Sequence, residues 1–104
     1  MIQHIVALSL KPDHDADELA AVMAGLAALG AAMDGFDRFT HGPNRDYEGK
    51  SADYPYGFVC EFSDPAALQV YANDPRHRAL GARLVAMCQG GGDGIMVIDL
   101  EVTT

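Results

Sequence analysis

Residues 71–77, Tyr-Ala-Asn-Asp-Pro-Arg-His, divide the second half of the chain into two helices. Asp74 is a favoured N-cap residue and Pro75 suits the first helical position, so the pair predicts that one helix ends and another begins here. His77 then falls in the first turn of the second helix. Apolar or small residues follow it at helical spacing, which places His77 on the buried face; they are Leu80, Gly81, Leu84 and Cys88. Because Tyr71 ends the preceding apolar stripe, we expect two proton-handling side chains near one apolar interior.

The rest of the chain alternates strand and helix patterns around this segment. Period-two and helical periodicities predict the following elements: a strand over 2–10, a helix over 15–33, strands over 36–41 and 54–62, a helix from 65 to about 73, a helix from 75, and a strand over 95–102. The order predicts one domain over residues 1–104 of the α+β class. We expect a ferredoxin-like split βαββαβ fold, with helices on one face of an antiparallel four-stranded sheet.

The other face of that sheet is predicted to be apolar and without a cover of its own. The residues expected there are Ile5, Ala7, Val59, Met96, Ile98 and Leu100. An apolar patch of this kind usually marks a partner surface. We therefore expect a homodimer in which a two-fold axis closes the two sheets into an α/β barrel.

Composition excludes several classes of function. The chain has 104 residues and a formal net charge of −8, which argues against nucleic-acid binding and against adhesion to anionic membranes. No apolar run approaches the length of a membrane span, and the first residues lack a positive signal segment, so we expect a cytoplasmic protein. Cys60 and Cys88 have no metal-binding spacing and are interpreted as small buried residues.

Several short motifs, in order along nearly the whole chain, resemble the stress-responsive dimeric A/B-barrel domain family and its olivetolic acid cyclase-type proteins. The matching pieces are His4-Ile5-Val6 with Leu8 and Leu10, Gly42-Pro43-Asn44, Cys60-Glu61-Phe62, Tyr71 with Asp74-Pro75-Arg76-His77, and Val97-Ile98-Asp99. Each piece is weak alone, but the set at these separations is fairly specific for the fold. The resemblance implies a homodimer with a pocket between each sheet and its helices.

The resemblance also implies roles for individual residues. In the cyclase-type enzymes a tyrosine and a histidine carry a cofactor-free aldol ring closure, and they correspond to Tyr71 and His77. His4 and Asp99 also have counterparts there. A further pocket histidine of those enzymes falls at Tyr56, which departs from their pattern. A bulky aromatic pair on their first helix falls near two smaller residues here, so we expect a different pocket shape; those two residues are Val22 and Met23.

The residues themselves permit acid–base chemistry. The helix dipole and partial burial both favour a neutral imidazole at His77, which can act as a general base. Asp99 could orient His77 from behind, and Tyr71 could donate to a substrate carbonyl as it becomes an enolate. We therefore take His77, Tyr71 and Asp99 as catalytic candidates. The pocket-lining candidates are His4, Val6, Leu8, Tyr56, Phe58, Val22 and Met23. The same three polar groups could instead form a buried structural network.

The leading hypothesis is a protein that binds a small, neutral or weakly acidic organic molecule and catalyses cyclase- or isomerase-like chemistry. We expect neither a cofactor nor a metal site. One alternative is a cofactor-independent monooxygenase of the quinol type, which oxygen uptake would reveal. The other is a non-catalytic stress or ligand-carrier protein, in which the pocket would bind without turnover or be packed with side chains.

Overall fold

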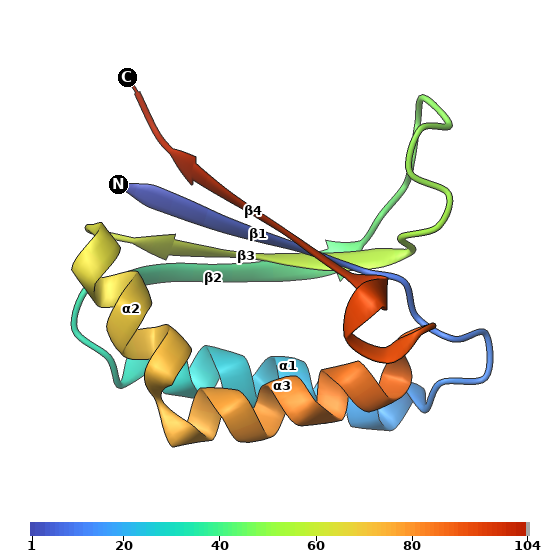
Figure 1. Ribbon diagram of the computed structural model, residues 1–104, viewed down its shortest axis with the longest axis horizontal. Helices are drawn as coiled ribbons and strands as arrows, with labels where there is room; N and C mark the ends of the chain where they lie inside the picture. Colours follow the sequence, from blue (N-terminus) through green and yellow to red (C-terminus); the bar gives the residue numbers. More distant parts are fainter. Residues whose placement is uncertain (104) are drawn as a thin grey trace.

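The computed structural model describes residues 1–103 and consists of two layers, a sheet and a set of helices (Figure 1). Along the chain the elements are β1 (Ile2–Leu8), α1 (Ala16–Ala31), β2 (Phe36–Pro43), β3 (Tyr56–Phe62), α2 (Pro65–Asn73), α3 (Pro75–Met87), a 3₁₀ turn η1 (Gly91–Gly94) and β4 (Ile95–Glu101). The three α-helices all lie on one side of the sheet, which leaves the other side of the sheet bare (Figure 1).

The sheet has the strand order β2-β3-β1-β4, and every neighbouring pair is antiparallel. β1 is therefore a central strand, paired with β3 on one side and with β4 on the other. In this register His4 lies opposite both Cys60 and Asp99. The strand order and the position of the helices confirm the predicted ferredoxin-like α+β fold.

Several strand boundaries differ from the sequence prediction. β2 continues to Pro43 instead of ending at residue 41, because its pairing with β3 extends to Tyr56, and β4 ends at Glu101 rather than at residue 102. β1 ends at Leu8, and Leu10 forms only an isolated bridge with Cys88. The backbone turns away because the amide of Ser9 donates to the Gly94 carbonyl. β3 begins at Tyr56 rather than at residue 54, because the preceding Pro55 has no N–H to donate to a ladder.

Asp74 fixes the junction between α2 and α3. Its backbone N–H donates to the Tyr71 carbonyl at the end of α2, while its carboxylate accepts from the Arg76 amide at 2.8 Å at the start of α3. Pro75 occupies the first turn, as predicted. The Arg76 guanidinium also binds this carboxylate and holds the pKa of Asp74 down at about 2, so the cap keeps its charge. The break in the helix therefore sets the separation of Tyr71 from His77.

The core lies between the sheet and the helices. Its largest side chains without appreciable exposure come from four elements and include one tyrosine; they are Tyr71, Phe62, Leu8, Met23, Leu26, Val22 and Cys60. Cys60 and Cys88 are free thiols and both are buried, as predicted. The opposite face of the sheet keeps large apolar side chains in solvent, among them Met96, Ile98 and Leu100 at 39%, 45% and 47% exposure.

Close packing at Gly30 supplies a test of this core. A Cβ atom at Gly30 would lie 2.6 Å from Cε1 of Phe36, and that ring packs against Phe62 with a centroid separation of 4.8 Å. We expect Gly30→Ala to lower the free energy of unfolding by about 1–3 kcal/mol, because overpacking outweighs the better helix propensity of alanine. Urea denaturation measures the change.

The matched control is Gly81→Ala in α3, where a Cβ would meet no atom within 4 Å. There the same substitution should raise the free energy of unfolding by about 1 kcal/mol, through helix propensity alone. Equal stabilisation by both substitutions would contradict the packing at Gly30.

Candidate functional site

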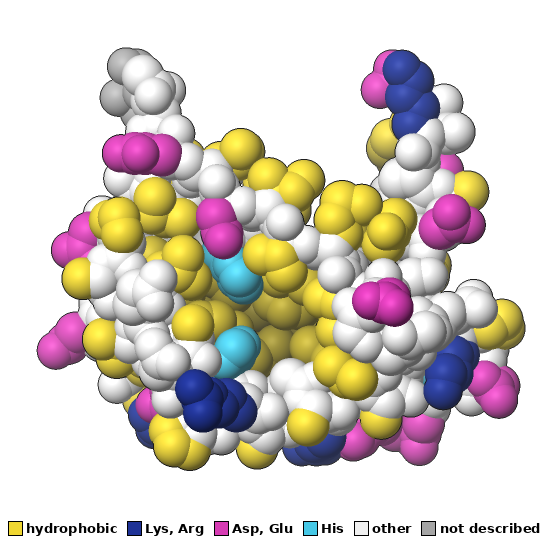
Figure 2. All heavy atoms as spheres, in the orientation of Figure 1, with side chains coloured by type: hydrophobic (Ala, Val, Ile, Leu, Met, Phe, Trp, Pro, Cys, Tyr) yellow, Lys and Arg dark blue, Asp and Glu magenta, His cyan; other side chains and the backbone are white. Residues whose placement is uncertain are grey.

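A hollow opens between β4 and the helix layer on the face of the molecule seen in Figure 2. Hydrophobic side chains form its floor, histidine side chains project into it, and an acidic side chain lies next to one of them (Figure 2). The strand above it is β4 and the helix below it is α3 (Figure 1). The contacts of the catalytic candidates explain how this hollow is built.

His4 and Asp99 form a hydrogen-bonded pair across β1 and β4. Their side chains face the same side of the sheet because they are opposite one another in the register. Nδ1 of His4 lies 2.6 Å from Oδ1 of Asp99. The His4 side chain is 13% exposed and that of Asp99 is 46% exposed. When Nδ1 carries the proton and donates to the carboxylate, Nε2 of His4 is left with a lone pair that can accept a proton.

His77 packs against Tyr71 across the junction of α2 and α3, with the two ring planes inclined by 44°. Their ring centroids are 4.2 Å apart. Nδ1 of His77 lies 3.2 Å from the Ala72 carbonyl, to which it can donate, so Nε2 again remains available. Burial lowers the pKa of His77 below its usual 6.5 and outweighs the hydrogen bond to the Ala72 carbonyl, which acts in the opposite direction. His77 is therefore a neutral base near pH 7.

Tyr71 lies between the two histidines and is 1% exposed. Its ring centroid is 6.0 Å from that of His4 and 5.2 Å from that of Phe62. The hydroxyl oxygen lies 4.0 Å from Sγ of Cys60, whose thiol can donate to it weakly. Burial raises the pKa of Tyr71 far above its ordinary value and raises that of the Cys60 thiol to about 12. The phenol stays neutral, so its proton can be donated.

The partner of Asp99 differs from the expected one. The sequence interpretation assigned Asp99 to His77, whereas the carboxylate binds His4. The reason is the register of β1 with β4, which places the two side chains directly opposite each other. His77 instead uses its Nδ1 for the carbonyl of Ala72, in the last turn of α2. Exact strand register was the signal needed to find this pair, and periodicity alone does not supply it.

Most of the expected pocket-lining residues lie in the core between the sheet and the helices. They are buried, at 0% to 5% exposure, and belong to the first strand, the third strand and the first helix: Val6, Leu8, Phe58, Val22 and Met23. Tyr56 is only half-buried and is not among the contacts of either His4 or His77. Its hydroxyl lies 2.6 Å from Nδ1 of His41, a pair that the sequence interpretation missed.

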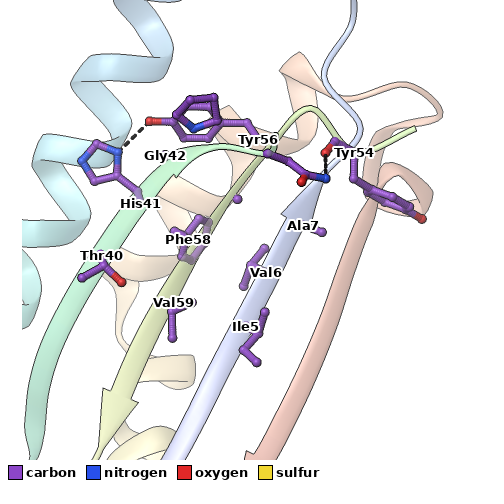
Figure 3. A pocket seen from close by; sticks show the side chains of 13 residues that line it. Ile5, Val6, Ala7, Thr40, His41, Gly42, Tyr54, Tyr56, Phe58 and Val59 are labelled. Atoms are coloured by element: carbon purple, nitrogen blue, oxygen red, sulfur yellow. Dashed lines mark hydrogen bonds between the residues drawn. The ribbon is translucent and has the colours of Figure 1, made fainter. Parts of the chain in front are cut away.

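This second histidine–tyrosine pair borders a separate cavity of about 320 Å³ (Figure 3). The cavity lies beside the foot of the loop that joins β2 to β3, at Asn44 and Tyr54. Most of its wall comes from the bare face of the sheet, where Ala7, Gly42 and Gly57 leave space. The other wall residues on this face include Ile5, Thr40 and Val59. No carboxylate lines this cavity, whereas the hollow by β4 combines a carboxylate, two imidazoles and a phenol.

Two further structural findings concern residues 1–103. No group of three or more His, Cys, Asp or Glu side chains in this range could hold a metal ion. No helix in the same range is both long enough and apolar enough to cross a membrane.

Comparison with known structures gives close matches to the fold. A dimeric ferredoxin-like protein of unknown function from Jannaschia sp. CCS1 is 48% identical, with a TM-score of 0.93; 97% of this chain and 98% of that chain are covered. A hydroxynitrile lyase from Passiflora edulis is 13% identical, with a TM-score of 0.82 and coverage of 98% and 93%.

SnoaB, a cofactor-independent oxygenase from Streptomyces nogalater, is 18% identical, with a TM-score of 0.77 and coverage of 99% and 93%. The two more distant structures show the fold alone. No functionally curated protein gives a significant sequence match. The family model of the stress responsive A/B barrel domain, however, matches residues 2–102. The chain therefore belongs to the family of stress responsive A/B barrel domains, as its motifs indicated.

Proposed function

We propose that the protein catalyses cofactor-free acid–base chemistry on a small, neutral or weakly acidic organic molecule bound in the hollow between β4 and α3. The observation that carries this proposal is the grouping of His77 and the His4–Asp99 pair on either side of Tyr71. A histidine with only a surface role does not require a buried tyrosine and a carboxylate-bound imidazole beside it. A carboxylate, two imidazoles with free Nε2 atoms and a neutral phenol supply an acid and a base to one small volume.

In the proposed first step, Nε2 of His77 removes a proton from the carbon next to a substrate carbonyl. The electrons of that C–H bond form the enolate, whose oxygen accepts the hydrogen bond of the Tyr71 hydroxyl. His77 suits the role of base because burial keeps its imidazole neutral near pH 7. Tyr71 suits the role of donor because the hydrogen-bond partner of its hydroxyl among residues 1–103 is the Cys60 thiol at 4.0 Å, which leaves the phenolic proton free.

The His4–Asp99 pair serves the second proton transfer, in which the product is protonated. In an aldol closure the enolate carbon attacks a second carbonyl carbon, and the resulting alkoxide takes a proton; in an isomerisation a different carbon takes it. Nε2 of His4 first accepts the proton that His77 took from carbon and then donates it to the product, while the Asp99 carboxylate holds the ring and stabilises the transient imidazolium. The proton on His77 returns in the same cycle, so no external acid is consumed. The apolar floor beneath the ligand would be formed by Val6, Leu8, Phe58, Val22 and Met23, whereas Tyr56 borders the separate cavity with His41 and is not part of this proposal.

Two other functions share this fold and are separated by experiment. The likeness to a cofactor-independent oxygenase motivates a test of oxygen uptake with anthrone- or quinol-type substrates. A carrier would bind ligand in the hollow without any turnover. The acid–base proposal is preferred because a carrier has no use for a carboxylate–imidazole pair beside a second neutral imidazole.

We also infer a cytoplasmic homodimer that uses the bare face of the sheet. On that face three apolar side chains of β4 remain between 39% and 47% exposed: Met96, Ile98 and Leu100. Exposed apolar rows of this size are typical of subunit interfaces. The Jannaschia protein, 48% identical, is described as dimeric. Two-fold pairing would bury the same row of side chains on both copies.

Substitution of His77 and Tyr71 tests the proposed chemistry. Proton abstraction is followed as deuterium uptake from D₂O at the α-carbon of small ketones, by ¹H NMR. We expect His77→Gln to lower the rate by about 100- to 10,000-fold, through loss of the base. Tyr71→Phe should lower it by about 100- to 1,000-fold, through loss of the oxyanion donor. Tyr71→Phe should leave the thermal midpoint nearly unchanged, because the hydroxyl makes only a weak contact.

The matched controls are His14→Gln and Tyr47→Phe. Among residues 1–103 the His14 side chain bonds to the Lys11 carbonyl alone, and Tyr47 is 92% exposed on the β2–β3 loop. Both controls should exchange α-protons at the wild-type rate. Full activity in His77→Gln would remove the proposed base, and full activity in Tyr71→Phe would leave Tyr71 with a packing role only.

The lowered pKa of His77 gives a pH prediction with a definite sign. Because its folded-state pKa lies below the unfolded value of 6.5, the unfolded chain binds more protons at this position. The contribution of His77 to stability is therefore lost as the pH falls below about 6.5, and activity should fall over the same window as the base becomes protonated. The imidazole signals of His77, followed by NMR, should titrate with a midpoint below 6.5. A midpoint above 6.5 would exclude the buried neutral base.

The dimer is tested with two matched substitutions to aspartate. Wild type should have a mass of about 22 kDa by light scattering, twice the 11.1 kDa of the chain. Ile98→Asp on the bare sheet face should shift the protein towards monomer, because a carboxylate in an apolar interface would be buried without a partner. Val70→Asp changes an apolar side chain that is 63% exposed on α2 and should leave the mass unchanged. A monomeric wild type at micromolar concentration would refute the dimer.

A further inference from the structure

Gly81 interrupts α3 without a packing reason. Glycine inside a helix costs about 1 kcal/mol relative to alanine. Gly25 and Gly30 of α1 are explained by close contacts, since a Cβ there would lie 2.8 Å from Cδ2 of Leu80 and 2.6 Å from Cε1 of Phe36. At Gly81 a Cβ would meet nothing within 4 Å. Among residues 1–103, therefore, no neighbour requires the missing side chain.

The position of Gly81 relates it to the hollow. It lies one helical turn after His77 and so shares the side of α3 that carries the imidazole. Val85, a further turn along that side, is 39% exposed. Gly81 is thus a notch between His77 and an exposed apolar side chain, at the rim of the space between α3 and β4.

The wall of the hollow that faces α3 is formed by β4 and is also apolar. Val97 of β4 lies opposite Val6 in the register, so both side chains point to the helix side of the sheet. Val6 is 4% exposed under the helices, but Val97 is 48% exposed because the helices do not extend over β4. Figure 2 shows the hollow open towards solvent with hydrophobic side chains around the histidines. The space beside His77 thus has apolar side chains above and below it and lies next to the polar groups of the candidate site.

We propose that Gly81 determines ligand specificity by leaving room for a flat apolar group, about the size of a phenyl ring, between Val97 and Val85. The ligand is then a neutral carbonyl compound that carries such a group next to the carbonyl held at His77. This inference rests on the proposed function for the placement of the carbonyl. A neutral ligand is favoured because Asp99 is 46% exposed at the rim, and the Arg78 guanidinium is held by Asn73 at 3.2 Å.

The experiment compares acetophenone with acetone as probes. Both have a methyl ketone, but only acetophenone has a phenyl group for the notch. Binding is measured from the shifts of the His77 imidazole signals by NMR in wild type, Gly81→Ala and Gly81→Leu. Ala79→Leu adds the same bulk at an exposed position on the opposite side of α3 and serves as control.

Wild type should bind acetophenone at least tenfold more tightly than acetone. Gly81→Leu should remove this preference by filling the notch, with acetone affinity within twofold of wild type, and Ala79→Leu should keep it. Gly81→Ala should weaken acetophenone binding several-fold while raising the thermal midpoint, since the methyl group improves the helix but narrows the space. Opposite signs for stability and binding in one variant are not expected of a merely structural glycine.

Unchanged acetophenone affinity in both Gly81 variants would overturn the proposal. Equal losses for acetone and acetophenone would also overturn it, because they would indicate a displaced His77 rather than a filled notch. A wild type without preference for acetophenone would do the same. Should Gly81→Leu fail to fold by circular dichroism, Gly81→Ala carries the test. Failure of the catalytic proposal is seen separately, as absence of α-proton exchange in a wild type that still prefers acetophenone.

Discussion

The hydrogen-bonded register of β1 with its two neighbours is the constraint on which the site depends. β1 is central, so one strand fixes the partners of His4 on both sides, Cys60 on β3 and Asp99 on β4. A slip of one residue would turn every β1 side chain to the other face and would separate the imidazole from its carboxylate. Tyr71 reaches the same place from the helix layer, where its hydroxyl meets Cys60. The acid–base groups thus come together because the strands pair in one register.

The helix layer positions its part of the candidate site through one residue, Asp74, which caps both α2 and α3. Asp74 ends α2 and begins α3, which turns the chain over a few residues and lets His77 fold back against Tyr71. Its carboxylate stays charged because Arg76 binds it, so the cap holds over the usual pH range. Tyr71 then links the two layers: its ring lies between the histidine of the sheet and the histidine of the helix.

Local chemistry made the fold predictable from the sequence. The Asp-Pro pairs at 64–65 and 74–75 are strong helix starts because they use backbone geometry and capping, and the apolar periods distinguish strands from helices. Tyr71 and His77 could also be singled out as candidate site residues, because they lie beside such a signal, and the structure brings their rings to 4.2 Å of one another. The pairing of His4 with Asp99 could not be predicted from the sequence. Asp99 is far from His4 in the sequence, and only the register of two strands brings them to 2.6 Å. The His41–Tyr56 bond was missed for the same reason.

The coverage of the sheet explains why the His4–Asp99 pair meets solvent at β4. The helices pack over β1 and β3, which buries Val6 and Cys60, but they leave β4 at an open edge. Asp99 and Val97 therefore face the helix side and still reach water. A fully covered sheet would bury the carboxylate at a large desolvation cost, and a fully open one would leave the imidazole of His77 solvated and without its shifted pKa. An edge strand next to a helix start keeps the carboxylate in contact with water and the imidazole partly buried, and this arrangement follows from the backbone topology.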